Sequence, residues 1–379
     1  MSTPSKILLV QLFSNGDCLY ATAVARQIKE DYPGATLTWA IADYCQQIIA
    51  NNPYVDAVMV VPDINHRNWQ AHWKAFHERL NRFQKDKVFD RIVFTQVIAQ
   101  NFALYDYCIR STIFRGYSIP LRVPVQPVLR LTENEIAKTE EFVRAHSIGR
   151  GVRAILFEYA PQSGQAGFSE DRARELAGKL TKEPGICVIL SSGKKMLSGN
   201  PQVLDGSVLS LRETAHLSRY CSLLVGCSSG ITWISTSEAG ARIPMIQILD
   251  PRAYWLNSVV NDHKRFQLPV DHIIELFDGA GQKLEECIVE ALRSDFAVAR
   301  LKYHQEAPRQ FKITRGIIVY LLGRGNLVGI WHHLRINLHL FGWDRLFLRS
   351  VWLGFIGFPV FWMRDAWKRW STSDNSSGD

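Results

Sequence analysis

Strands and helices alternate twice along this chain of 379 residues, and that alternation restricts its possible folds more than any other feature. Apolar runs in the first half predict strands at 6–12, 35–42, 57–61 and 91–95. Segments with helical spacing separate them, at 17–31, 45–50, 69–83 and 102–113. This order predicts a parallel, doubly wound sheet with right-handed crossovers.

The second half repeats the pattern after a stretch, 117–128, that contains three prolines and so cannot be a regular helix or a central strand. Strands are predicted at 154–157, 186–190, 203–210, 222–225 and 243–249. Helices are predicted at 133–146, 169–180, 213–220 and 282–303. We therefore predict two Rossmann-like domains, 1–148 and 149–305, with a cleft between the carboxyl edges of their sheets, where ligands bind in this architecture.

The last part of the chain, 306–370, has a different composition. Residues 309–370 hold ten Lys or Arg, only two Asp or Glu, and six of the eleven tryptophans. The longest uncharged apolar run, 350–363, is shorter than the roughly 20 residues that a spanning helix needs. Basic residues interleaved with Trp and Leu favour helices that lie on a membrane surface. A helical cap on the two domains, or an oligomer contact, is the alternative. The polar end, 371–379, is predicted to be disordered.

The charge balance, the cysteines and the N-terminal segment indicate which partners and which cellular compartment to expect. Residues 1–308 carry 34 basic and 32 acidic side chains, so the body has no cationic excess for nucleic acid. The seven cysteines are scattered without a CxxC pair, which favours reduced, buried thiols. No basic segment followed by an apolar run precedes the first strand, so we expect no signal peptide and a cytoplasmic location.

The loop after the first strand, 13–17, contains the first candidate site. Asp17 lies at the start of a helix, where an acidic residue most often caps the helix. Alternatively, Asp17 faces the cleft as a general base, and partial desolvation of its carboxylate there raises its pKa. Asn15 and Gly16 precede it, and Gly16 would allow a tight turn, so we include both as substrate-binding candidates.

Two further loops carry small polar residues that could hold phosphate through neutral donors. Ser163, Gly164 and Gln165 follow the first strand of the second half, and Ser228, Ser229, Gly230 and Thr232 lie between a strand and a helix. Ordinary turns explain the same residues without function. Lys194 could reach a phosphate, or could be a solvated surface lysine. No Asp-x-Asp motif and no HExxH-like histidine spacing is present, so we predict binding without a metal.

With these residues identified, the chain resembles glycosyltransferase family 9, the heptosyltransferase-like enzymes of GT-B fold. The resemblance covers about residues 6–300. It rests in the first half on 6–10, 16–17, 21–24, 32–33 and 52–61, and in the second half on 161–164, 169–180 and 225–239. Each motif is weak alone; their order and spacing are more specific.

The resemblance implies an inverting transfer of a sugar from a nucleotide diphosphate sugar to a hydroxyl of a cell-envelope glycan or lipid-linked acceptor, of the lipopolysaccharide type. The acceptor would lie on the first domain and the donor on the second. The family's presumed base falls on Asp17. Its turn Asp-Thr-Gly-x-x-His falls on 228–233, where Ser228 replaces the Asp and Trp233 replaces the His.

The expected function is thus a glycosyltransferase that acts without metal or other cofactor. Residues 309–370 would hold it on the inner face of the cytoplasmic membrane. Two alternatives remain open. The chain could be a GT-B-like binding or scaffold protein that has lost catalysis, or another GT-B-like enzyme such as a sugar-nucleotide epimerase.

Overall fold

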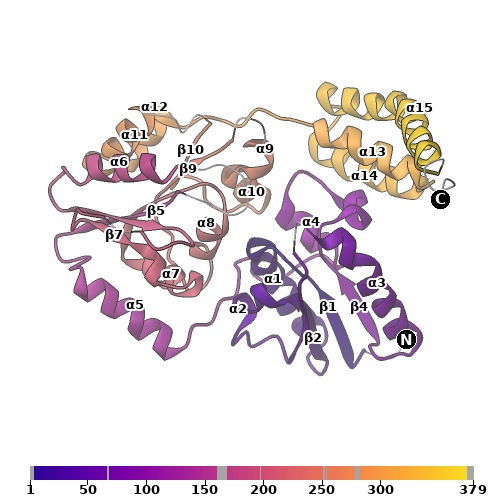
Figure 1. Cartoon of the computed structure of the whole chain (residues 1–379), viewed down its shortest axis with the longest axis horizontal. Coiled ribbons are helices and arrows are strands. Elements are labelled where there is room, and N and C mark those ends of the chain that lie inside the picture. Colours follow the sequence, from indigo (N-terminus) through magenta and orange to yellow (C-terminus); the bar gives the residue numbers. More distant parts are fainter. Residues whose placement is uncertain are drawn as a thin grey trace.

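The structure is a computed structural model that describes residues 4–65, 68–159, 169–196, 198–250, 252, 254–277 and 282–373. Two α/β halves lie side by side, and a group of helices at the C-terminus lies against the first half (Figure 1). This is the predicted fold class, with two Rossmann-like parallel sheets and a helical tail.

The first half contains a parallel sheet with strand order β3-β2-β1-β4. Its strands are β1 (Lys6–Val10), β2 (Thr36–Ala42), β3 (Ala57–Val61) and β4 (Arg91–Phe94). Its helices are α1 (Asn15–Asp31), α2 (Gln46–Ile49), α3 (Trp69–Lys85) and α4 (Ile109–Arg115). The central strand β1 is an unbroken apolar run from Ile7 to Val10, and all four of these side chains are buried, as expected where helices cover both faces.

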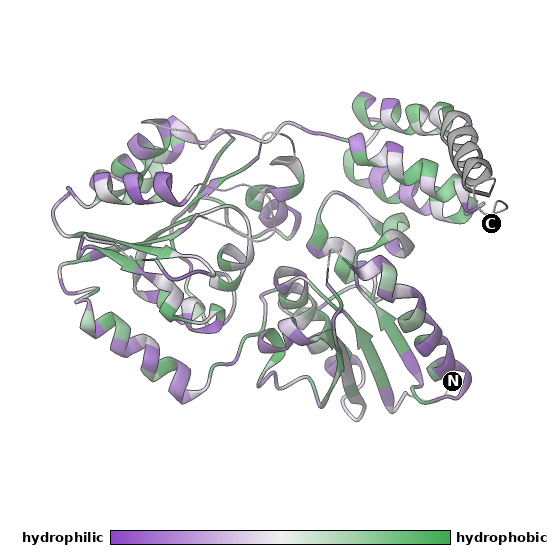
Figure 2. Ribbon diagram, viewed as in Figure 1, coloured by the Kyte–Doolittle hydropathy of each residue, from purple (hydrophilic) through white to green (hydrophobic). Residues whose placement is uncertain are grey.

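The second half contains a parallel sheet with order β10-β9-β8-β5-β6-β7. Its strands are β5 (Arg153–Glu158), β6 (Ile186–Ser191), β7 (Val203–Asp205), β8 (Cys221–Gly226), β9 (Met245–Ile248) and β10 (Ile273–Leu276). Its helices are α5 (Glu133–Ala145), α6 (Glu170–Leu180), α7 (Leu211–Leu217), α8 (Gly230–Ser235), α9 (Tyr254–Asn257), α10 (Val259–Arg265), α11 (Gln282–Arg293) and α12 (Phe296–Tyr303). The strands are the most hydrophobic part of each half (Figure 2).

Strand order locates the ligand-binding edge of each sheet. The order reverses between β1 and β4 in the first sheet and between β5 and β8 in the second. In doubly wound folds ligands bind outside the carboxyl ends of the strands at such a reversal. The loops after β1 and β8, which carry most of the predicted site residues, therefore lie at the expected positions.

Helix α5 packs on the second half, although the predicted boundary at 148 assigns it to the first. Thr139 donates a hydrogen bond to the carbonyl of Glu213 in α7, and Lys138 forms a 2.9 Å ion pair with the Glu213 carboxylate. Figure 1 shows α5 beside α7. The boundary itself stays a prediction, but this packing favours placing it before residue 133.

Two helix predictions differ from the structure. The segment 102–113 is not one helix: a 3₁₀ segment, η2 (Ala99–Leu104), precedes α4, and Tyr107 between them has a φ of 68°. The segment 282–303 is two helices, because Asp295 caps α12 by accepting a hydrogen bond from the backbone of Ala297. Apolar periodicity continues across both breaks, so it did not reveal them.

The tail consists of α13 (Lys312–Gly323), α14 (Leu327–Phe341) and α15 (Arg345–Ser373). It docks on the first half through a cluster that includes Tyr105, Tyr107 and Phe311. The Tyr107 hydroxyl donates to the carbonyl of Phe311 at 3.1 Å, and Asn337 donates to the carbonyl of Tyr105 at 3.0 Å. The tail is thus a cap on the fold. Of the described helices, none combines the length and the apolar character needed to cross a membrane.

Candidate functional site

The loop after β1 is fixed by a residue from the loop after β4. The side-chain oxygen of buried Gln96 accepts hydrogen bonds from the backbone of Leu12 at 2.8 Å and Phe13 at 3.0 Å. Ser14 then has a φ of 72°, which turns the chain sharply into α1. The two loops at the strand-order reversal are therefore bound together, and they hold the start of α1 in place.

Asp17 lies in the first turn of α1 and does not cap it. Ser14 occupies the cap position, and its side chain makes no capping hydrogen bond. Asp17 is partly exposed, yet the surrounding protein desolvates its carboxylate and raises its pKa to about 7. Among the described residues, none donates a hydrogen bond to this carboxylate. An unpaired carboxylate with this pKa is suited to accept a proton near neutral pH.

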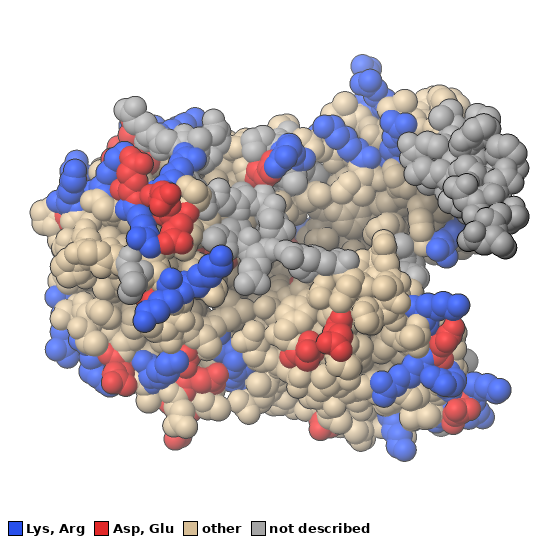
Figure 3. Space-filling model, viewed as in Figure 1, with Lys and Arg blue, Asp and Glu red and all other residues tan. Residues whose placement is uncertain are grey.

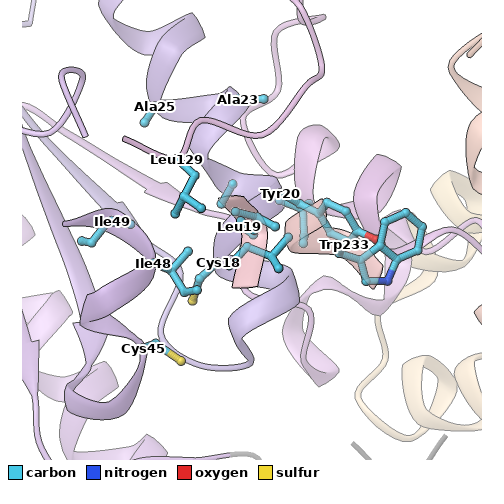
Figure 4. Close-up of a cluster of buried hydrophobic side chains, with 14 of the residues drawn as sticks. Cys18, Leu19, Tyr20, Ala23, Ala25, Cys45, Ile48, Ile49, Leu129 and Trp233 are labelled. Carbon is cyan, nitrogen blue, oxygen red and sulfur yellow. The ribbon is translucent and has the colours of Figure 1, made fainter. Parts of the chain in front are cut away.

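The start of α1 faces the second half of the molecule. A methyl group on Gly16 would lie 3.8 Å from Cδ1 of Trp233 in α8. Tyr20, on the same side of α1 as Asp17, has its ring 5.1 Å from that of Trp233 (Figure 4). The start of α1 therefore packs against α8, and both lie at the carboxyl edges of their sheets. Asp17 lies in this first turn of α1.

A buried ion pair joins the halves next to this contact. Arg110 of α4 lies 2.9 Å from Asp262 of α10, and its guanidinium lies over the rings of Tyr20, Trp233 and Phe266. Both members of the pair are buried. Trp233, which replaces the His expected from the resemblance, thus packs at the contact between the domains.

The turn between β8 and α8 is held by Gln247 of β9. The Gln247 side-chain oxygen accepts hydrogen bonds from the backbone N–H of Ser228 at 2.7 Å and from the Thr232 hydroxyl at 3.0 Å. Ser228 has a φ of 54°, and Thr232 is fully buried. These two predicted phosphate donors therefore have internal partners and act first as structural groups.

An internal carboxylate occupies the start of α8. Glu158, the last residue of β5, accepts a hydrogen bond from the Ser229 hydroxyl and a 3.5 Å bond from the backbone N–H of Ile231. Burial raises the pKa of Glu158, while these hydrogen bonds oppose the rise. Its second oxygen is buried and has no hydrogen-bond partner in the part of the chain that the structure describes. Glu158 is thus placed where a donor phosphate was expected.

The other predicted residues are not joined to this site by the described contacts. Ser163, Gly164 and Gln165 lie outside the described residues, as does the whole segment 160–168 that follows β5 and Tyr159. Lys194 is exposed after β6. Asn15 is partly buried in α1, with its side-chain oxygen unpaired among the described residues. The expected cleft also stays a prediction. A surface pocket of about 350 Å³ lies instead by α2 and β3, and no predicted site residue lines it.

Metal ligands are not gathered in the described part of the chain. No group of three or more His, Cys, Asp or Glu residues is placed there to hold an ion. All seven cysteines are buried and unpaired, as predicted. Burial raises the pKa of the Cys227 thiol, so this residue next to the α8 turn is not activated as a nucleophile.

Four of the residues at this site were not identified from sequence: Gln96, Arg110, Glu158 and Gln247. Each belongs to a different loop, helix or strand, and only the topology brings them together. Glu158 gave one usable signal, because an acidic residue that directly ends a buried apolar strand is unusual.

Comparison with known proteins supports the fold. No family model and no curated protein matches the sequence. Among solved structures, the chain is similar to a family 9 glycosyltransferase from Veillonella parvula, with a TM-score of 0.51 and 14% identity over 76% of this chain and 89% of that one.

Two Escherichia coli proteins are more distant. One is ADP-heptose lipopolysaccharide heptosyltransferase II, with a TM-score of 0.44 and 16% identity over 65% of this chain and 85% of that one. The other is TibC, described as an iron-containing dodecameric glycosyltransferase, with a TM-score of 0.42 and 14% identity over 74% of this chain and 64% of that one. The expected resemblance is confirmed at the level of architecture: this chain has the fold of the family 9 glycosyltransferases.

Proposed function

We propose that the protein is an inverting glycosyltransferase that uses Asp17 as its general base. The acceptor hydroxyl gives its proton to the Asp17 carboxylate. The acceptor oxygen then attacks the anomeric carbon from the face opposite the diphosphate, and the bond from that carbon to the nucleoside diphosphate breaks. The observation that carries the proposal is the position of Asp17. Its carboxylate has a pKa of about 7 and no hydrogen-bond donor among the described residues, and it lies in the turn of α1 that packs against α8.

The donor would bind to the second domain, beside the reversal between β5 and β8. Residues Ser163 to Gln165 and Ser228 to Thr232 remain the candidates to hold its diphosphate without a metal. Glu158 complicates this assignment, because its carboxylate already accepts from Ser229 and Ile231. We propose that Glu158 is protonated when donor is bound, so that the phosphates meet a neutral group; its raised pKa supports this.

The acceptor would be a glycan or glycolipid of the cell envelope, met at the inner face of the cytoplasmic membrane. The basic, Trp-rich helices α13 to α15 support this, because they are fixed to the same domain as Asp17. They would bring the base to a membrane-borne hydroxyl.

A second function, a binding protein without catalysis, is favoured by one observation. An internal carboxylate already fills the start of α8, and Trp233 fills the contact between the domains. If both arrangements are permanent, no nucleotide sugar enters. The chain would then recognise a glycan through its first domain alone.

Thermal shift with a panel of nucleotide diphosphate sugars, followed by product analysis with acceptor, separates the two. A bound donor at a hundred times its Kd stabilises the fold by about 2.7 kcal/mol. The transferase predicts a rise in Tm with one donor and a product that contains both sugar and acceptor. No shift with any donor would support the binding protein, and a converted sugar without acceptor would indicate an epimerase.

A further inference from the structure

The outward side of α15 carries a row of large apolar side chains. Leu346, Trp352, Leu353 and Ile356 recur at helical spacing, and Trp343 lies in the turn just before the helix. Trp343, Trp352 and Ile356 are 79%, 68% and 63% exposed. Isolated exposed apolar residues are common, but a continuous row of this kind indicates an interaction surface. We call these five residues the outer row.

The outer row is not an unfilled part of the core. The opposite side of α15 already packs closely on α13, where a methyl group on Gly354 would lie 2.7 Å from Cβ of Ile318. Phe347, on the inward side, is fully buried in the cluster that joins the tail to the first half. The cap therefore has its own packed interior, and the outer row is free to contact something else.

The surroundings of the outer row are basic. Arg345 and Arg349 are exposed on the same helix. The acidic residue nearby, Asp344, forms a 3.2 Å ion pair with Arg309. On the face of α13 to α15 visible in Figure 3, the described side chains include Lys and Arg but no Asp or Glu. An excess of positive charge around exposed tryptophans favours an anionic, partly apolar partner.

The exposed apolar row and the positive charge around it together favour one kind of partner. A second copy of the chain, paired through the same row, would bring two positively charged tails together. A nucleic acid would match the charge but would leave the apolar row without a partner. An anionic lipid surface satisfies both, since tryptophans settle at headgroup depth, apolar side chains reach the acyl boundary and arginines meet the phosphates.

We propose that the outer row of α15, with Arg345 and Arg349, docks flat on an anionic bilayer. This deepens the membrane part of the proposed function and rests on it. Because Tyr107 and Asn337 join the tail to the first half, docking would hold the domain that carries Asp17 close to the lipid surface. The second domain would then lie farther from the membrane.

The test is flotation of the full chain with two kinds of vesicle, phosphatidylcholine alone and equal parts phosphatidylcholine and phosphatidylglycerol. The double variant Trp352→Gln with Ile356→Gln should bind the mixed vesicles at least about tenfold more weakly than the wild type. The variant Arg345→Gln with Arg349→Gln should lose most of the difference between the two kinds of vesicle. All the changed side chains are exposed, so Tm should stay unchanged.

The matched control is Val298→Gln with Leu301→Gln, on the exposed side of α12, where these side chains are 48% and 87% exposed. It should bind vesicles as the wild type does. Equal binding by the outer-row variant and the control would overturn the proposal. So would a wild-type dimer that the outer-row variant breaks, or binding of a single-stranded oligonucleotide as tight as that of the mixed vesicles.

The result is independent of catalysis. Asp17→Asn should float like the wild type, since Asp17 is not part of the tail. If Asp17→Asn keeps full transfer activity while the outer-row variant fails to float, the catalytic assignment is wrong and the docking surface stands. If both variants float and only Asp17→Asn loses activity, the docking surface is wrong and the catalytic assignment stands.

Discussion

At the scale of single residues, desolvation accounts for the raised pKa of Asp17, whose carboxylate accepts no hydrogen bond from the part of the chain that the structure describes. An acidic residue in the first turn of a helix normally has a lowered pKa, because the helix dipole favours its charge. Here desolvation outweighs that effect and raises the pKa to about 7. The sequence allowed both a cap and a base; the structure excludes a side-chain cap, and the catalytic role stays a prediction.

The pH dependence of transfer follows from this pKa. A general base works only when it is deprotonated, so kcat/KM should rise as pH increases and reach half its plateau near pH 7. A pH–rate profile with the donor found by the thermal-shift screen measures this. A profile that stays flat between pH 5 and 9 would contradict the role of Asp17.

Glu158 gives a prediction about donor affinity. Glu158→Gln keeps an oxygen for Ser229 and Ile231 but removes the negative charge at the start of α8. The variant should bind the nucleotide sugar at least about tenfold more tightly at pH 8, where the wild-type carboxylate repels the phosphates most strongly.

At lower pH the two proteins should converge, because the raised pKa of Glu158 lets its carboxyl take up a proton. Calorimetric titration at both pH values measures this. Equal affinities at pH 8 would show that the donor phosphates bind away from Glu158.

At the scale of elements, the second sheet contains a similar buried carboxylate. Glu275 of β10 accepts hydrogen bonds from the Ser258 hydroxyl at 2.9 Å and the Val260 backbone at 3.0 Å, at the start of α10. Burial raises its pKa from 4.5 to about 7. Because the pKa is higher in the folded state, folding favours the protonated form of Glu275. The contribution of this group to the free energy of unfolding is therefore fully present below pH 4.5 and is lost as the pH rises through 7.

Glu275→Gln should therefore raise stability at pH 8 by up to about 3 kcal/mol and leave it nearly unchanged at pH 4, because the amide replaces the protonated acid. Tm measured at both pH values tests this. A Tm that falls at pH 8 would mean that the carboxylate is needed in its charged form.

At the scale of the whole molecule, a buried ion pair connects the two halves. Arg110 and Asp262 belong to different domains and lie beside the contact between Gly16 and Trp233. Burial raises the pKa of Asp262 even though the Arg110 guanidinium lowers it. Such a pair adds little net stability, but losing one partner leaves a buried charge.

Arg110→Met should lower the free energy of unfolding by about 3–5 kcal/mol, because Asp262 then stays buried without its cation. The double variant Arg110→Met with Asp262→Leu should recover most of that loss. The Tm values of the single and double variants measure this loss and its recovery. A double variant less stable than either single one would mean that the pair itself stabilises the contact between the domains.

Much of the architecture could be predicted from the sequence because local patterns fix it. Apolar runs such as 7–10 identify central strands, and strand–helix alternation makes the sheets parallel. The side of the molecule that bears Asp17 followed from the same rule. The tail's helices were expected from composition, and a cap on the two domains was the stated alternative to membrane binding. The sequence did not show that the tail packs on the first half while α15 keeps an exposed apolar row.

The partners of the predicted site residues could not be read from the sequence. Glu158 reaches Ser229 across 71 positions, and Arg110 reaches Asp262 across more than 150. Contacts of this kind depend on how strands are ordered and how the domains face each other, and no local spacing encodes them. The resemblance indicated that Trp233 stands in place of a His. It could not indicate that the Trp233 ring packs on Tyr20, because that contact also depends on how the domains face each other.

The most direct test of the central claim is the rate of sugar transfer by Asp17→Asn, measured together with its affinity for the donor. Asp43→Asn, an exposed carboxylate in the same domain, is the matched control. We expect Asp17→Asn to lower kcat by about 10²–10⁴ while the donor Kd stays near that of the wild type, and the control to change neither. Full turnover by Asp17→Asn would contradict the assignment of Asp17 as the base that deprotonates the acceptor.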